Sequence, residues 1–228
     1  MARSAAGPAT EDVTFDELIE AARELASSGE RRILGITGAP GSGKSTLAEV
    51  VVEALGGSAV LVGQDAFHLS NAELHRLGRF ERKGAIDTFD AHGYVNLLRR
   101  LRARDEDVVY CAVFDRSIEE SLACSVPMPA EVPLVVTEGN YLLVPDDPWG
   151  QVAGLLDECW FVDPSEEVRL ERLIARHEAF GRTPEEARER TLGSDQRNAE
   201  RIASTRHLAD RVVRPAKVTP AEGPPTSP

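Results

Sequence analysis

The sequence predicts an α/β fold in which helices cover both faces of a mostly parallel sheet and a small helical lid lies beside it. Three observations lead to this prediction. Short apolar runs rich in β-branched residues, typical of buried strands, alternate with segments of helical periodicity. One strand and the helix after it are joined by a glycine-rich loop of defined spacing. Near the C-terminal end, a segment rich in Glu and Arg carries few apolar residues, as in a solvent-exposed lid.

The elements follow in order along the chain of 228 residues. Thr14 and Glu17 have the spacing of a capping box and predict a helix from Thr14 to Leu25. Apolar runs predict buried strands at 33–37, 59–62, 108–114, 134–137 and 159–163, with a last edge strand at 210–213. Helical periodicity predicts helices at 43–55, 93–101, 149–156 and 166–180, and another from Pro184. The stretch 71–90 reads as irregular, and three prolines between 127 and 133 indicate a loop.

These elements predict a single domain at 13–214 with its lid at about 177–205. We expect disorder at 1–12, which is small and polar, and in the Pro-containing tail at 215–228. The net charge of −12, from 38 acidic and 26 basic residues, argues against a nucleic-acid or anionic-membrane partner. No apolar run reaches the length of a membrane span, so we expect a cytoplasmic protein. The oligomeric state stays open, with a homodimer among the options.

The glycine-rich loop has the spacing G-x-x-x-x-G-K-[ST] of a phosphate-binding loop. Its glycines let backbone N–H groups approach phosphate oxygens, and the helix that follows directs its positive end at the anion. Lys44 is expected to contact the β- and γ-phosphates, and Ser45 to bind Mg²⁺. The sequence therefore predicts ATP and Mg²⁺ as ligands. The predicted nucleotide site comprises Gly38, Ala39, Pro40, Gly41, Ser42, Gly43, Lys44, Ser45 and Thr46.

Three further residues are candidates for catalysis or metal binding, together with Lys44. Asp65 follows the second buried strand, where it could accept a proton from a substrate hydroxyl or contribute to the metal site; an Asx turn or a helix cap is the alternative. Glu138 follows the strand 134–137 and is expected to hold Mg²⁺, unless it is an ordinary strand-end carboxylate. Arg176 could stabilise phosphoryl charge in the transition state, although helical arginines are often solvated.

Cationic residues on irregular segments predict the site of a second substrate. Arg82, Lys83 and Arg116 would hold a polar acceptor that is anionic or polyhydroxylated. The alternative is that all three form surface ion pairs with neighbouring carboxylates. His68 and Tyr141, which follow Asp65 and Glu138 closely in the chain, complete the predicted acceptor site.

The sequence lacks motifs of several other nucleotide-binding classes. It has no Asn/Thr-Lys-x-Asp stretch of GTPases and no Leu-Ser-Gly-Gly run of transporter ATPases, and it is short for a ring ATPase. A small-molecule kinase remains, a phosphotransferase with an alcohol group as acceptor. The alternative is a nucleotide-binding regulatory ATPase without a small-molecule acceptor.

Several motifs together resemble the superfamily of uridine kinase, phosphoribulokinase and bacterial pantothenate kinase. They are Gly38–Thr46, Asp65-Ala66-Phe67-His68-Leu69, Arg82-Lys83-Gly84, Asp87-Thr88-Phe89-Asp90, Phe114-Asp115-Arg116, Glu138-Gly139-Asn140-Tyr141 and Ser194-Asp195-Gln196-Arg197-Asn198-Ala199. The similarity is greatest to the bacterial branch that resembles fructose transport system kinases. It implies a P-loop NTPase three-layer sandwich, Asp65 as catalytic base, Glu138 as the metal-associated acid, and a nucleoside, sugar or pantothenate-like acceptor. Uridine kinases carry Tyr-Asp-Phe in place of Phe114-Asp115-Arg116, so the resemblance does not extend to uridine itself.

Overall fold

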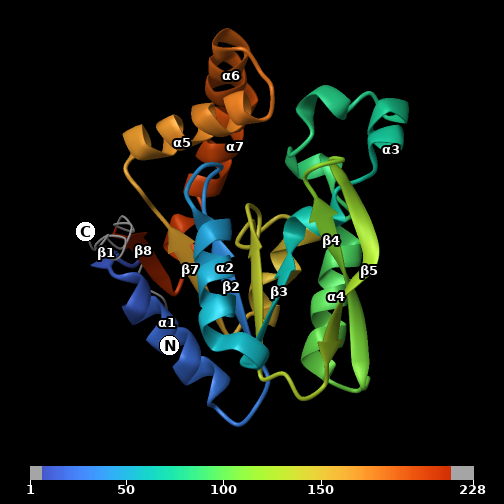
Figure 1. Ribbon diagram of the computed structural model, residues 1–228, viewed down its shortest axis with the longest axis vertical. Coiled ribbons are helices and arrows are strands. Elements are labelled where there is room, and N and C mark those ends of the chain that lie inside the picture. Colours follow the sequence, from blue (N-terminus) through green and yellow to red (C-terminus); the bar gives the residue numbers. More distant parts are fainter. Residues whose placement is uncertain (1–6, 217–228) are drawn as a thin grey trace, which may run out of the picture.

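A parallel sheet of six strands forms the centre of the molecule in the computed structural model, which describes residues 7–216 (Figure 1). The strand order is β1-β8-β7-β2-β6-β3, and every neighbouring pair is parallel. The strands are β1 (Thr10–Val13), β2 (Arg32–Thr37), β3 (Ala59–Gly63), β6 (Leu134–Gly139), β7 (Glu158–Val162) and β8 (Arg211–Pro215). The carboxyl ends of the parallel strands therefore meet at one edge of the sheet, where ligands bind in α/β folds.

Helices α1 (Phe15–Ala26) and α2 (Lys44–Leu55) pack on one face of the sheet. The capping box predicted at the start of α1 is confirmed, since Thr14 and Glu17 exchange side-chain-to-backbone hydrogen bonds. Successive strand residues point to opposite faces. Leu34 and Ile36 of β2 accordingly face this helical layer, while Ile33 belongs to the apolar cluster of the other face.

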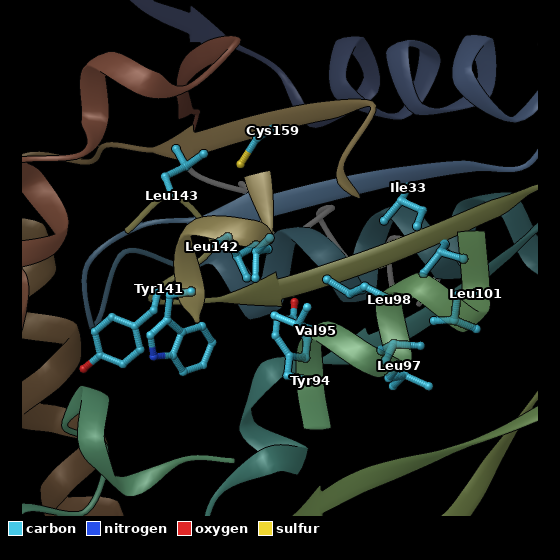
Figure 2. Close-up of a cluster of buried hydrophobic side chains, with 14 of the residues drawn as sticks. Ile33, Tyr94, Val95, Leu97, Leu98, Leu101, Tyr141, Leu142, Leu143 and Cys159 are labelled. Carbon is cyan, nitrogen blue, oxygen red and sulfur yellow. The ribbon is translucent and has the colours of Figure 1, made fainter. Parts of the chain in front are cut away.

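The other face is covered by α4 (Ala91–Ala103) and by the segment that follows β6. Figure 2 shows Leu98 and Leu101 of α4 near Ile33, with Tyr94 and Leu142 in the same cluster. The Tyr94 hydroxyl lies 2.7 Å from Thr137 Oγ1, which in turn donates to the carbonyl oxygen of Val62 at 2.6 Å. A buried hydroxyl that lacks a partner is costly, so this pair fixes α4 against the carboxyl ends of β3 and β6.

Above the carboxyl edge of the sheet, the chain forms two projecting parts (Figure 1). One part, which we name the lid, consists of α5 (Glu166–Ala179), α6 (Pro184–Arg190), a π-helical segment (Thr191–Asp195) and α7 (Gln196–Ala203), and it overlaps the range of about 177–205 expected for a lid. The other part includes the short helix α3 (Asn71–Arg76) and the acceptor loop, as we name residues 79–88. No helix of the described residues is long and apolar enough to span a membrane.

The structure corrects the expectation of a loop around the prolines. Strands β4 (Val108–Asp115) and β5 (Glu120–Pro129) form a separate antiparallel hairpin, so the predicted strand 108–114 is not part of the main sheet. Pro127 and Pro129 lie within β5 opposite Tyr110 and Val108. Proline is tolerated in edge strands, and both strands of a two-stranded sheet are edges. Proline content therefore did not exclude a strand here.

The ends of the chain differ from expectation in a second way. Residues 10–12 belong to β1 and are not disordered as predicted, and β8 is consequently covered by β1 and is not an edge strand. Main-chain pairing of β1 with β8 needs no apolar side chains, and the ion pairs Glu11–Arg211 at 2.7 Å and Asp12–Arg214 at 3.2 Å accompany it. The predicted helix 149–156 is instead two 3₁₀ turns, Trp149–Gln151 and Ala153–Leu155. The tail from 217 onwards and residues 1–6 lie outside the described residues.

Candidate active site

The phosphate-binding loop connects β2 to α2 at the carboxyl edge of the sheet. Gly41 and Gly43 have φ angles of 81° and 94°, which favour glycine. A Cβ atom at Gly41 would lie 2.7 Å from the carbonyl oxygen of Arg169, and one at Gly43 would lie 3.0 Å from the Arg172 guanidinium. The loop is thus closely covered by α5, and its glycines are required by both conformation and space.

Several features of the loop fit a bound polyphosphate. The Ser42 hydroxyl is buried and has no hydrogen-bond partner within residues 7–216, as expected of a donor that awaits an anion. Lys44 begins α2, where the helix dipole also favours negative charge. Burial lowers the pKa of Lys44, and the nearby carboxylates of Glu138 and Asp65 oppose this effect. Of the predicted nucleotide-site residues, Pro40, Lys44 and Ser45 line one cavity.

Ser45 and Glu138 form the candidate metal site. Ser45 Oγ donates to Glu138 Oε2 at 3.3 Å, which brings together a hydroxyl and a carboxylate, the oxygen ligands that Mg²⁺ prefers. Glu138 is 6% exposed, and its burial raises its pKa, while Lys44 acts in the opposite direction. A cation at these oxygens would remove the cost of the buried carboxylate charge. The residues present therefore fit a magnesium ion.

A cavity of about 490 Å³ begins at the phosphate-binding loop and continues between the hairpin, the acceptor loop and the lid. Lys44, Asp65, Arg116 and Arg176 all line it, so one space contains the predicted nucleotide-side and acceptor-side residues. Asp65 lies directly after β3, in the turn Gln64–Phe67. Its carboxylate Oδ2 is 3.3 Å from Arg116 Nη2. Arg116 directly follows the hairpin strand β4, which places its guanidinium next to Asp65.

The orientation of His68 is defined by its neighbours. Its Nδ1 lies 2.8 Å from the carbonyl oxygen of Asp65, which only accepts, so Nδ1 carries the proton. The ring packs against Phe89 and Phe114, with centroids 3.9 Å and 5.1 Å away. Burial lowers the pKa of His68, although Asp65 acts in the opposite direction. The neutral form is thus favoured, and its Nε2 is an acceptor for a donor group in the cavity.

Lys83 reaches the cavity from the acceptor loop, but its ammonium group already has partners. It donates to Asn71 Oδ1 at 2.8 Å, lies 3.8 Å from the Glu119 carboxylate and is 5.0 Å from the centre of the Phe114 ring. Burial lowers the pKa of Lys83, with Glu119 opposing it. Lys83 therefore joins the acceptor loop to the hairpin, in addition to placing a positive charge in the cavity wall.

Two predicted acceptor-site residues do not line the cavity. Arg82 is half exposed and pairs with Asp87 at 2.7 Å, which is the surface ion pair considered as the alternative from sequence. Tyr141 is fully buried, its hydroxyl donating to the carbonyl oxygen of Gly84 at 2.7 Å and its amide to Gln64 Oε1 at 3.0 Å. Tyr141 supports the acceptor loop through its hydrogen bond to Gly84 and does not line the cavity.

The lid contributes arginines that sequence analysis did not single out. Arg182 and Arg190 line the cavity together with Arg176, and within the described residues none of the three has a carboxylate within 4.0 Å. Surrounding protein lowers the pKa of Arg176, and the Arg116 guanidinium adds to this effect. Unneutralised guanidinium groups beside a phosphate loop favour binding of an anion. The composition of the lid gave only a general signal for them, since other arginines of this part of the chain do not line the cavity.

Comparisons with known proteins show the family of the chain. The family model described as "Phosphoribulokinase / Uridine kinase family" matches residues 33–214. A Schizosaccharomyces pombe protein, described as a candidate uridine kinase, is 33% identical over 196 residues, which cover 81% of this chain and 83% of that protein.

Solved structures share the fold. One from Silicibacter sp. TM1040, described as a candidate fructose transport system kinase, has a TM-score of 0.79 at 31% identity and covers 89% of this chain and 100% of that chain. Phosphoribulokinase from Rhodobacter spheroides has a TM-score of 0.53 at 16% identity, covers 78% of this chain and 69% of its own, and shows the fold alone. The P-loop kinase fold is thereby confirmed. The chain belongs to the phosphoribulokinase/uridine kinase family of P-loop kinases.

Proposed function

We propose that this protein transfers the γ-phosphoryl group of ATP to a hydroxyl of a small metabolite. The observation that supports this most directly is the position of Asp65, whose carboxylate lines the same cavity as Lys44 and Arg116. A phosphoryl-transfer enzyme needs an acceptor hydroxyl next to a proton acceptor and in line with the phosphate. Asp65 shares this cavity with Lys44 and is 3.3 Å from Arg116, which suits a general base for such a hydroxyl.

The residues of the cavity have separate parts in this reaction. Asp65 takes the proton of the attacking hydroxyl, and His68 Nε2 orients the acceptor by accepting a hydrogen bond from it. Lys44 and Arg176 balance the charge of the transferred phosphoryl group. Mg²⁺ at Ser45 and Glu138 would neutralise phosphate charge when it is bound. The side chains of the cavity therefore mainly position the reactants and stabilise charge, which is the dominant need in phosphoryl transfer.

The acceptor is polar and is either polyhydroxylated or anionic. Arg116 presents a planar guanidinium suited to a carboxylate, a phosphate or vicinal hydroxyls, and His68 requires a hydrogen-bond donor. A nucleoside, a sugar or a pantothenate-like molecule would meet both requirements. Two relatives, described as a candidate uridine kinase and a candidate fructose transport system kinase, are consistent with a polyhydroxylated acceptor.

The function is tested by screening for the acceptor and then removing the base. A panel of sugars, nucleosides and vitamins is measured by thermal shift with and without Mg²⁺ and an ATP analogue, because a bound acceptor stabilises the fold. Hits are assayed for phosphorylated product. Asp65→Asn should lower kcat by ~10²–10⁴ while the affinity for ATP stays within a few-fold.

Lys44→Ala serves as the comparison variant, since it should weaken ATP binding as well as turnover. Wild-type kcat in Asp65→Asn would place the base elsewhere. If ATP is hydrolysed slowly and no acceptor in the panel is phosphorylated, a nucleotide-binding regulatory ATPase becomes the better description.

A further inference from the structure

The lid contacts the phosphate-binding loop through arginine side chains on main-chain carbonyl oxygens. Arg169 of α5 donates to the carbonyl of Pro40 at 3.4 Å, and Arg172 donates to that of Ser42 at 3.3 Å. Both carbonyls belong to the loop whose amide groups would bind phosphate. A change in this loop on nucleotide binding therefore acts directly on α5.

The opposite end of the lid contacts the acceptor loop in the same manner. Arg190, the last residue of α6, donates to the carbonyl of Glu81 and, at 2.8 Å, to that of Lys83. Asn198 of α7 donates to the carbonyl of Gly84 at 3.5 Å. The planar guanidinium of Arg190 meets the two carbonyls through two different nitrogens, whereas the amide of glutamine offers a single, uncharged donor nitrogen on a shorter side chain.

Lys83 connects this contact with the lid to the wall of the cavity. Its carbonyl accepts from Arg190 of the lid, while its ammonium group donates to Asn71 and lies near Glu119 at the hairpin turn. The position of the Lys83 charge in the acceptor half of the cavity is thus set jointly by the lid and the hairpin. Displacement of Arg190 would remove the lid's contribution to the position of the Lys83 side chain.

The segment between α6 and α7 is suited to a rearrangement. It is π-helical, and such segments occur frequently at functional sites. The hydroxyls of Thr191 and Ser194 are buried there without a hydrogen-bond partner in the described part of the chain, so another arrangement could satisfy them. Asp195 Oδ2 lies 2.7 Å from His177 Nε2, which connects this segment to the end of α5. The two ends of the lid are therefore joined through this π-helical segment.

We propose that Arg190 is a positioning residue that couples the lid to the acceptor loop, so that nucleotide at the phosphate-binding loop orders the acceptor site. The proposal rests on the proposed function in so far as it requires nucleotide binding. Such a coupling is reciprocal, and a bound acceptor would increase the affinity for ATP by the same factor. Acceptor and nucleotide would then each favour the closed arrangement in which transfer occurs.

Hydrogen exchange tests the contact first without nucleotide. The amides of Lys83 and Ala85 are bonded within the acceptor loop, to the carbonyls of Phe80 at 3.0 Å and Arg82 at 2.9 Å, so their exchange reports opening of the loop. Arg190→Gln should raise this exchange roughly tenfold. Arg188→Gln is the matched control, because Arg188 is an exposed residue of the same last turn whose side chain makes no hydrogen bond or ion pair to the described residues. Equal exchange in all three proteins would overturn the proposal.

The second arm adds Mg²⁺ and adenylyl imidodiphosphate, a non-hydrolysable ATP analogue. In the wild type and in Arg188→Gln, the analogue should protect both residues 184–203 of the lid and the acceptor loop (79–88). In Arg190→Gln it should protect the lid alone. Acceptor-loop protection in Arg190→Gln equal to that of the wild type would refute the coupling.

Two further readouts separate this role from a general loss of structure. With the acceptor found, Arg190→Gln should weaken acceptor binding several-fold in the presence of the ATP analogue and leave the affinity for the analogue alone, without acceptor, unchanged, and Arg190→Lys should restore part of the loss. A comparable loss of analogue affinity without acceptor would contradict a positioning role. Absence of any protection by the analogue in the wild type would instead refute the proposed nucleotide binding, and the nucleotide-free arm would still decide whether Arg190 holds the acceptor loop.

Discussion

Substitution of Gly41 by alanine tests whether the shape of the phosphate-binding loop depends on its cover by α5. Gly41 has a φ of 81°, and a Cβ atom there would lie 2.7 Å from the carbonyl oxygen of Arg169 and 3.2 Å from Leu173 Cβ. Neither neighbour can move easily, because the oxygen belongs to the backbone of a helix and Leu173 is fully buried. The loop and α5 must therefore separate, or the loop must change its conformation.

The magnitude follows from the backbone conformation alone as a lower bound. An L-residue in the left-handed region costs about 1–2 kcal/mol, and the close contact adds to this. If the loop relieves the strain by leaving its phosphate-binding shape, affinity for an ATP analogue should fall roughly 5–30-fold. If it keeps its shape, the same free energy should appear as a loss of stability.

Calorimetric titration with Mg²⁺ and the analogue, together with thermal melting, measures both outcomes. Gly57→Ala provides the matched control, since a Cβ at Gly57 meets no atom within 4 Å and its φ is not in the left-handed region. The control should alter neither quantity appreciably. Wild-type affinity combined with wild-type stability in Gly41→Ala would refute the reasoning.

Two other substitutions address the metal site and the acceptor site. Because burial raises the pKa of Glu138 above its unfolded value, its stability contribution is present below about pH 4.3 and is lost as pH rises through the raised pKa. Glu138→Gln should therefore have a higher Tm than the wild type at pH 7–8 and a similar Tm near pH 4. It should also weaken Mg²⁺-dependent nucleotide binding. A lower Tm than the wild type at pH 8 would contradict this reasoning. Arg116→Ala should raise the acceptor KM by ~10-fold or more, about 1.4 kcal/mol, with the KM for ATP unchanged. Arg82→Ala, at the surface pair with Asp87, is its control, and equal effects of both variants would return Arg116 to a surface role.

Much of the central sheet could be predicted because its signals are local. The runs at 33–37, 59–62, 134–137 and 159–163 became β2, β3, β6 and β7, and the capping box at Thr14 formed as expected. The phosphate-binding loop is likewise encoded in a short stretch, since its glycines and Lys44 are fixed by the spacing along the chain. Local backbone preferences and apolar periodicity determine such features before any long-range contact forms.

Strand pairing was harder to predict, since a strand's partner is chosen by tertiary packing. The run at 108–114 has the composition of a buried strand, but it pairs with β5 in a separate hairpin. β1 has little apolar character and is recruited to β8 through main-chain hydrogen bonds. The composition of a strand indicates which of its faces is buried, but it does not indicate which neighbouring strand it will pair with.

The chain's local patterns were enough to predict the parallel α/β fold, the phosphate-binding loop and the position of Asp65 after its strand, whereas Glu138, expected just after its strand, lies within the last residues of β6. Only the tertiary structure decided which cations share the cavity. Arg82 and Lys83 are adjacent in the chain, yet Arg82 pairs with Asp87 at the surface while Lys83 meets the hairpin and the lid. Arg190, more than a hundred residues away, reaches the same loop. Contacts between distant segments depend on how separate elements pack, and no local pattern in the chain encodes that packing.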